Sequence, residues 1–501
     1  MKPDAIRKVT LTGLRWLALK SVLGEVVGVT STVILARLIS PAEFGHAAVA
    51  LLFCLLAVIL TFEGFASALV QRPTVDERHL RVAVLMSLVG GTIVGAFVLI
   101  TAPLVWRSVF GAETARLIAL TAPCFVLASI GTVSRATLWR RLDFRRMTQC
   151  DLAGLMVGNI VSIVLAVSGL GAVALVVGTM AGITTGSVGM LLSAPEPLPR
   201  WDRAAARDIA HFGVHASMAG LVTQLFANID YWILAARLSA FTTGIYYRAF
   251  NLGVVYQGKI SNVMMQLAFP VYSRVQDRGE MRRLHERAAR VHAVVIFPLL
   301  ALLFVLAPVL IPFAFGAEWT PAIVPAQILA IAGMFNALLT GYPQVMLAVG
   351  RPRDLMRFNC CVLVTYASAI ALAASHGLVT VAITVVVVYA LILAGAYRFL
   401  LRPHLGVSVG RLLPEMGPAV VGCVALVAIC WPLRIIMEPV LPRAVTLLLV
   451  GCIGLAVYGV VLKALFAPTW GDLKLLIARV IPVGGIVRAR RVPMTSTTPA
   501  Q

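Results

Sequence analysis

The chain has 501 residues, of which 60% are hydrophobic and 13% charged, and its formal net charge at pH 7 is +21. A soluble globular protein carries roughly 25% charged residues, so this composition excludes an ordinary soluble protein. The surplus of bases does not indicate nucleic-acid binding, because the arginines lie in short gaps between apolar runs and form no contiguous basic face. We therefore expect a membrane protein with no nucleic-acid partner.

Apolar runs of about 20 residues, the length needed to cross a bilayer, follow one another almost end to end. They predict an all-α membrane protein with about fourteen transmembrane helices and no soluble domain. The predicted spans are 17–38, 45–66, 81–103, 115–134, 149–168, 171–192, 211–236, 244–270, 290–313, 321–347, 358–375, 378–398, 414–436 and 443–466.

The positive charges are distributed unevenly between the two sides of these spans. Of the 42 Lys and Arg residues, 34 lie in the N-terminal segment, in alternate loops and in the C-terminal tail. Cytoplasmic loops of membrane proteins are enriched in Lys and Arg. We therefore predict that both termini are cytoplasmic and that the protein lies in an inner membrane.

Two short sequences recur about 200 residues apart. The segment 34–38, followed by Gly45, resembles the segment 233–238, followed by Gly244, and Phe-Gly-Ala-Glu occurs at 110–113 and again at 315–318. These repeated segments predict duplication of a six-helix unit, with two lobes related by a pseudo-two-fold axis along the membrane normal. The predicted domains are an N-terminal six-helix lobe (1–195), a C-terminal six-helix lobe (205–400), two additional helices (412–466) and an amphipathic, disordered cytoplasmic tail (467–501).

Polar side chains within spans are costly unless they face protein or water, and the predicted span 244–270 has the most. At about 100° per residue, one stripe of this helix contains Arg248, Asn251, Lys259, Asn262 and Gln266. We interpret the stripe as a cationic lining for an anionic substrate. The alternative is that Arg248 extends to the outer interface while the amides join neighbouring helices.

Further charged residues lie in the first, second and seventh predicted spans. Lys20 is a further candidate for substrate binding. The acidic residues Glu25, Glu63 and Asp230 are candidates for ion coupling or for pairing with the basic stripe. Pairing is the simpler interpretation, because a buried charge is stable only with a partner.

The sequence contains no motif for a cofactor or a metal site. No GxxxxGK[ST] segment occurs, so we expect no ATP hydrolysis by the chain itself. His211 and His215 have helical i, i+4 spacing, but no third ligand is near them and both fall at a predicted membrane interface. We expect neither a cofactor nor a metal.

Several motifs resemble those of the polysaccharide-transporter, or lipid-linked oligosaccharide flippase, family of the multidrug/oligosaccharidyl-lipid/polysaccharide exporter superfamily. The resemblance covers residues 10–465. The segments that show it are Leu35–Gly45, Asn228–Asp230, Gly244–Tyr246, Phe269–Arg274, Phe315–Trp319 and Gly350–Pro352.

This resemblance implies a V-shaped carrier that moves an undecaprenyl-diphosphate-linked glycan, such as an exopolysaccharide precursor, to the outer leaflet. The implied partners are the lipid-linked glycan, membrane lipids, a polysaccharide polymerase and glycosyltransferases. The related lipid II flippases use basic residues in spans one and eight, where Lys20, Arg248 and Lys259 lie in this sequence. Glu25 in the first span departs from that pattern.

Two other functions are compatible with so many spans. A multidrug or small-solute cation antiporter would use Glu25 or Asp230 as its coupling carboxylate, but the bases of the eighth span oppose a cationic substrate. A membrane glycosyltransferase or polymerase needs catalytic residues on sizeable outer loops, and the predicted outer loops are very short. We therefore expect that the protein is not an enzyme.

Overall fold

The computed structural model describes residues 3–61, 66–261, 264, 272, 275 and 277–480, and all regular elements in them are helical, as predicted. The elements of the first half are α1 (Pro3–Leu38), α2 (Pro41–Thr61), α3 (Ser67–Gln71), α4 (Glu77–Thr101), η2 (Ala102–Trp106), α5 (Arg107–Phe110), α6 (Ala112–Leu120), α7 (Ala122–Ser129), α8 (Thr132–Arg140), α9 (Phe144–Val167), α10 (Gly171–Ser193), α11 (Arg203–Ala227) and α12 (Ile229–Arg237). Those of the second half are α13 (Ala240–Phe250), η3 (Asn251–Val255), α15 (Arg278–Phe315), η4 (Ala317–Ala322), α16 (Ile323–Leu339), α17 (Tyr342–Ala348), α18 (Pro352–Ala374), α19 (Leu378–Gly395), η5 (Ala396–Leu401), α20 (Arg402–Leu405), α21 (Val409–Met437), α22 (Arg443–Leu465) and α23 (Ala467–Val480).

Within the described residues, 12 helical segments are long and apolar enough to cross a membrane, so the chain is a multi-pass membrane protein. They correspond to twelve of the fourteen predicted spans. The predicted span 211–236 falls on α11 and α12, which are separate helices meeting at Asn228. The predicted span 244–270 begins with α13 and η3, and much of its second half lies outside the described residues. The count of fourteen therefore stays a prediction.

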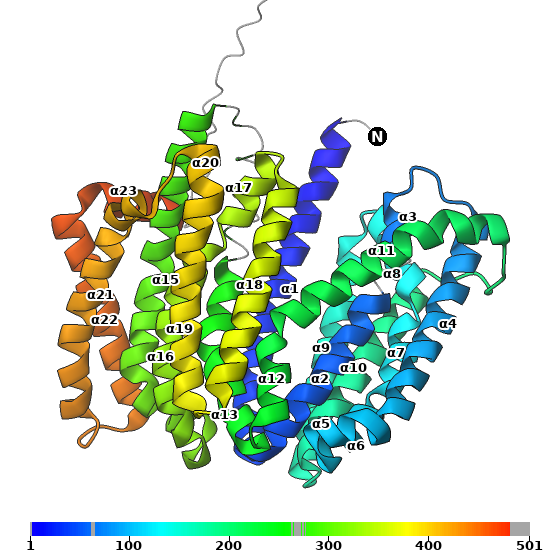
Figure 1. The fold of residues 1–501 in the computed structure, drawn as a ribbon, viewed down its shortest axis with the longest axis horizontal. Helices are drawn as coiled ribbons and strands as arrows, with labels where there is room; N and C mark the ends of the chain where they lie inside the picture. Colours follow the sequence, from blue (N-terminus) through cyan, green and yellow to red (C-terminus); the bar gives the residue numbers. More distant parts are fainter. Residues whose placement is uncertain are drawn as a thin grey trace, which may run out of the picture.

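The helices form two groups that lie side by side, with α1 between them (Figure 1). One group contains α2 to α10, and the other contains α13 to α23. Helix α11 runs obliquely from the first group toward α12. We call the end that bears the N-terminus and α23 the inner end, following the predicted orientation, and the opposite end, with the α1–α2 and α15–η4 turns, the outer end.

The two Phe-Gly-Ala-Glu segments adopt the same backbone conformation at equivalent places. Gly111 ends α5 with φ 83° and ψ 170°, and Gly316 ends α15 with φ 106° and ψ 169°. This region of backbone space is favourable only for glycine. The sequence echo thus corresponds to a shared helix-ending turn at the outer end, which supports the predicted duplication.

The packing of the first group of helices depends on glycines where α9 and α10 cross. A Cβ atom on Gly154 would lie 2.6 Å from the carbonyl oxygen of Gly182, and one on Gly158 would lie 2.9 Å from that of Gly178. Real side chains do not tolerate such distances to backbone atoms. The two helices therefore pack at backbone contact, as small residues allow membrane helices to do.

The repeat-related glycines Gly45 and Gly244 face each other where α2 meets α13 at the outer end. A Cβ on Gly45 would lie 1.8 Å from the carbonyl oxygen of Ala240, and one on Gly244 would lie 1.9 Å from that of Pro41. Each Cβ would also lie 3.0 Å from the backbone nitrogen of the opposite glycine. The contact is reciprocal, as expected for equivalent positions of two repeats, and it brings the two groups of helices together at the outer end.

The predicted amphipathic segment after the last span is the helix α23 as far as Val480, and residues 481–501 lie outside the described part. Asp472 on α23 accepts hydrogen bonds from Arg287 (2.5 Å) and Arg290 (3.4 Å) of α15. Arg290 also pairs with Glu415 of α21 at 3.1 Å. These ion pairs fix α23 and α21 against the inner end of α15.

Candidate functional site

A cavity of about 480 Å³ lies between α1 and the predicted eighth span, toward the inner end. Lys20, Glu25 and Thr32 line it from α1, and Asn251 and Lys259 line it from the other side. Glu25 and Thr32 share one face of α1, because residues seven apart lie two turns above one another on a helix. We call this space the mouth cavity.

A second cavity, of about 180 Å³, continues toward the outer end, and we call it the apex cavity. It shares Thr32, Asn251 and Tyr256 with the mouth cavity, so the two adjoin. Its other lining residues include Phe44 and Arg248. The apex cavity is therefore bounded by α1 and α2 on one side and by α13 and η3 on the other.

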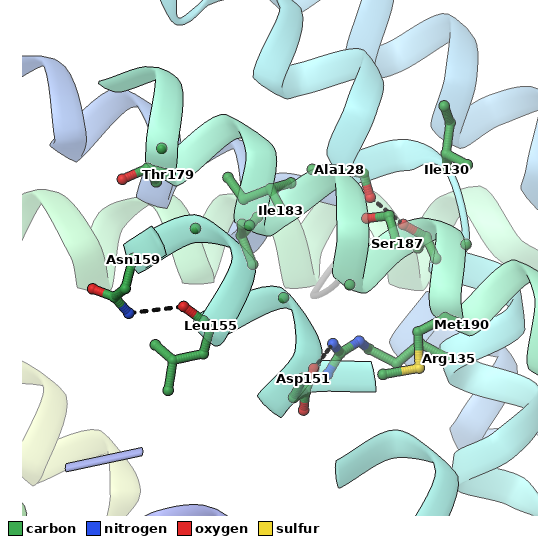
Figure 2. Close-up of a pocket in the computed structure, with 18 of the residues that line it drawn as sticks. Ala128, Ile130, Arg135, Asp151, Leu155, Asn159, Thr179, Ile183, Ser187 and Met190 are labelled. Atoms are coloured by element: carbon green, nitrogen blue, oxygen red, sulfur yellow. Dashed lines mark hydrogen bonds and ion pairs between the residues drawn. The ribbon is translucent and has the colours of Figure 1, made fainter. Parts of the chain in front are cut away.

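A third cavity, of about 540 Å³, lies beside the crossing of α9 and α10, is also lined by residues of α7 and α8, and is drawn in Figure 2. It shares Asn159, Ser162 and Thr179 with the apex cavity. Figure 2 shows Arg135 and Asp151 pointing toward one another as an ion pair. This lobe cavity is lined mainly by glycines and apolar side chains, and its close charge pair is Arg135 with Asp151.

Carboxylates accompany the cations of the mouth cavity. The Nζ atom of Lys259 lies 2.8 Å from Oε2 of Glu25, and each of these side chains is 47% exposed. The Nζ atom of Lys20 lies 2.6 Å from Oδ2 of Asp151, which also binds Arg135. Exposed ion pairs are worth about 0.2–1 kcal/mol. An incoming anion can therefore exchange with the carboxylate of Glu25 at small cost.

Arg248 differs from these cations because it is buried, with 3% of its surface exposed. Its guanidinium carbon lies 4.8 Å from the ring centroid of Phe44, 4.7 Å from that of Phe315 and 5.0 Å from that of Trp319. Its Nε and Nη2 atoms have no hydrogen-bond partner among the described residues. The alternative that Arg248 extends to the outer interface is therefore wrong, and the side chain points into a ring cage at the apex.

Asp230 lies away from these cavities, within the second group of helices. It is 1% exposed, and its Oδ2 accepts hydrogen bonds from the hydroxyls of Tyr246 (2.9 Å) and Tyr366 (3.4 Å). The backbone N–H of Tyr231 donates to Oδ1 at 3.0 Å. Among the described residues Asp230 has no ion-pair partner, so it does not pair with the basic stripe there.

The structure thus brings together five of the predicted site residues, namely Lys20, Glu25, Arg248, Asn251 and Lys259. The side chains of Glu63, Asn262 and Gln266 lie outside the described residues. The π-helical turn η3 interrupts the regular helix on which the predicted stripe was drawn. Even so, Arg248, Asn251 and Lys259 all line the connected cavities.

Sequence reasoning missed Asp151, Arg135 and Tyr256. Asp151 is an acidic residue near the start of a predicted span, a signal comparable to the one that identified Glu25. Tyr256 gave no such signal, yet it lines two cavities and its ring centroid lies 5.2 Å from Nζ of Lys259.

Residues 34–324 match the model of a family described as "Polysaccharide biosynthesis protein". The chain belongs to this family. The match covers more than half of the sequence and includes the last residues of α1 and all of α2 and α13, which bound the apex cavity. It confirms the resemblance that the motifs indicated.

The chain is similar to two curated relatives and to one solved structure, among others. Lipopolysaccharide biosynthesis protein WzxC of Escherichia coli (strain K12) is 24% identical over 361 residues, which are 71% of this chain and 73% of that protein. Teichuronic acid biosynthesis protein TuaB of Bacillus subtilis (strain 168) is 24% identical over 403 residues, 77% of this chain and 80% of that one. The lipid II flippase MurJ in an inward closed conformation has a TM-score of 0.72 at 12% identity, covering 90% of this chain and 98% of that chain. At that identity the likeness to MurJ shows the fold alone.

Proposed function

We propose that this chain is a flippase that moves an undecaprenyl-diphosphate-linked oligosaccharide, or a related polysaccharide precursor, across the bacterial inner membrane by alternating access. The observation that carries the proposal is the set of connected cavities between the lobes, with a buried cation at the closed end. A buried Arg without a carboxylate partner among the described residues is matched to an anionic group. Relatives named for lipopolysaccharide and teichuronic acid biosynthesis and a lipid II flippase of the same fold support this assignment.

The proposed architecture has fourteen spans: two six-helix lobes (1–195 and 205–400), two further helices (412–466) and a cytoplasmic tail (467–501), with both termini cytoplasmic. The reciprocal contact of Gly45 and Gly244 supports a pseudo-two-fold axis between the lobes.

The proposed substrate-binding residues are Lys20, Arg248, Asn251 and Lys259 in the connected cavities, and Asn262 and Gln266 farther along the same predicted span. Their cations suit the diphosphate or an acidic sugar. The lobe cavity beside them, where Asn159, Ser162 and Thr179 offer hydrogen-bonding groups, has room for uncharged sugars. The lipid tail remains in the bilayer, since a long hydrocarbon chain gains nothing by leaving it.

The proposed cycle begins with the cavities open toward the inner end. The diphosphate exchanges with Glu25 at Lys259, the lobes rock, and the cavity then opens outward. We propose no chemical step and no enzyme activity. An ion gradient or the membrane potential would drive the cycle. Moving one elementary charge across the membrane potential changes the free energy by about 2.3 kcal/mol per 100 mV. Asp230, Glu25 or Glu63 would be the coupling carboxylate. A polymerase and glycosyltransferases are the proposed partners, because they would supply and consume the glycan.

A multidrug or small-solute cation antiporter is the alternative, and the buried carboxylate of Asp230 without an ion-pair partner among the described residues is the feature that favours it. The buried Arg248 opposes it, because a cationic substrate would be repelled at the apex. Drug susceptibility of a deletion strain decides between them: unchanged susceptibility with lost surface polysaccharide supports the flippase.

The proposal is tested by Arg248→Ala and Lys259→Ala in a strain that lacks the chromosomal gene. We expect each variant to reduce surface polysaccharide at least tenfold while membrane levels of the protein, measured by immunoblot, stay the same. Arg357→Ala is the matched control, because this side chain is 78% exposed on the inner end. Normal polysaccharide in both cavity variants would show that the cationic lining is not used.

A further inference from the structure

Four side chains close the outer end of the apex cavity, and we call them the outer seal: Phe44, Arg248, Phe315 and Trp319. Phe44 comes from α2 in the first group of helices, whereas the other three come from α13, α15 and η4 in the second. The rings of Phe44 and Trp319 meet edge to face at 5.3 Å. The indole N–H of Trp319 donates to the carbonyl oxygen of Ala36 on α1 at 2.8 Å. The outer seal therefore joins the two groups.

The outer seal is the wall between two pockets. Phe44 and Arg248 line the apex cavity on its inner side. Phe315 and Trp319 line a separate pocket of about 540 Å³ at the outer end, together with Glu43. Since Arg248 contacts both phenylalanine rings and the indole, its guanidinium occupies the middle of this wall.

The guanidinium is held in the wall by ring contacts without an anion among the described residues. Its Nε and Nη2 atoms lack hydrogen-bond partners there. A buried charge without a counter-ion is unfavourable, and a bidentate bond to an oxyanion is stronger than a cation–ring contact. An oxyanion in the apex cavity is therefore a better partner for Arg248 than the cage.

Anion binding and the closed cage compete for the same space. Three rings lie within 5.0 Å of the guanidinium carbon, and the side chain is buried. The Nε and Nη2 donors on the guanidinium edge are covered in this closed arrangement and have no partner among the described residues. An oxyanion that binds this edge displaces a ring or draws the side chain out of the cage.

We infer that Arg248 controls the opening of the outer seal. An oxyanion that enters the apex cavity withdraws the guanidinium from Phe44, Phe315 and Trp319, and this allows the outer end to open. The inference rests on the proposed function, because it takes the diphosphate of the substrate as that oxyanion. A ligand shifts a conformational equilibrium only by its difference in affinity for the two states. Here the open state binds the anion better, because Arg248 is then free to meet it.

The test measures the separation of the lobes at the outer end by pulsed electron spin resonance on the purified full chain. Spin labels are placed at Glu113→Cys and Thr320→Cys, two exposed positions in outer turns of the two lobes. The exposed cysteines Cys360, Cys361 and Cys452 are first replaced by Ser. Inorganic diphosphate is the probe, and its binding is measured in parallel by calorimetry.

We expect diphosphate to convert at least half of the short-distance population to a longer distance. Arg248→Met fills the cage but cannot bind an anion, so it should stay at the short distance with and without diphosphate. Phe44→Ala removes the ring contributed by the first group, and it should show the long distance without diphosphate. Arg434→Met is the matched control, because Arg434 is also buried over an indole, that of Trp431 at 5.0 Å, but lies on α21 outside the seal. It should respond like the parent.

The outcomes separate this inference from the proposed function. Diphosphate that binds the parent without changing the distance overturns the inference alone, as does an Arg248→Met variant that responds like the parent. A parent that binds no diphosphate overturns the anion-binding cavity and the inference with it.

Discussion

Glu25 and Lys259 face each other across the mouth cavity, 2.8 Å apart, with half of each side chain exposed. The carboxylate of Glu25 binds Lys259 at the position where, in the proposed function, an anionic group of the substrate binds. The departure of this chain from the basic pattern of the first span therefore has a physical consequence: Lys259 is neutralised while the cavity is empty. Arg248, without such a carboxylate, is the stronger attractor for an anion that has entered.

The tethered carboxylate predicts that Glu25→Gln increases the affinity for inorganic diphosphate. An exposed ion pair of about 0.2–1 kcal/mol corresponds to an increase of roughly one and a half to fivefold, measured by calorimetry on the purified protein. Glu113→Gln is the control, since Glu113 pairs with Arg116 on the surface and should leave the affinity unchanged. A lower affinity in Glu25→Gln would mean that Glu25 positions Lys259 for the anion and does not compete with it.

At the scale of elements, the first turns of α2 and α13 determine how closely the lobes meet on the outer side. Both contain a glycine, and each glycine lies against the backbone of the other helix. Backbone atoms cannot move aside as a flexible side chain can. The outer seal, one turn farther along α13, depends on this approach.

The glycine contact predicts that Gly45→Ala or Gly244→Ala prevents full closure of the outer end. We expect a Thr32→Cys reporter in the apex cavity to react with a membrane-impermeant maleimide from outside at least tenfold faster in either variant. Surface polysaccharide should fall in parallel. Gly258→Ala is the control, because a Cβ there would meet nothing within 4 Å. Unchanged labelling in both variants would show that the lobes close without this contact.

At the scale of the whole molecule, the number of spans depends on the segment between the two lobes. The described residues contain 12 membrane-crossing candidates, and none covers residues 203–277. Helix α11 begins with the charged residues Arg203, Arg207 and Asp208 and runs obliquely (Figure 1). The fourteen-span prediction requires the chain to cross the membrane near α12 and to return through α13.

Alkaline phosphatase fused after residue 240 decides this point, because that enzyme is active only outside the inner membrane. Fourteen spans place residue 240 outside, so we expect high activity there and low activity for a fusion after residue 281. If residues 203–277 did not cross, both fusions would be inactive. A fusion after residue 316 is the control, since both arrangements place it outside.

The resemblance to the family and the general position of the site could be predicted from the sequence, and the physical reasons are clear. Lys259 and Arg248 are charges inside an apolar segment, and such charges must face the interior because of their desolvation cost. Asp151 could have been found in the same way. The lobe cavity could not, because its glycines serve close packing and line a space at once, and sequence spacing does not separate these roles.

The sequence by itself determined that the chain is an all-helical membrane protein of a polysaccharide biosynthesis family with basic groups in its interior. Hydropathy, charge bias and short motifs are local properties, so they can be read along the chain. Only the tertiary structure decided that Arg248 lies among Phe44, Phe315 and Trp319, and that Glu25 neutralises Lys259. These contacts join residues far apart in the chain, and their distances depend on how two helical groups meet at a pair of glycines.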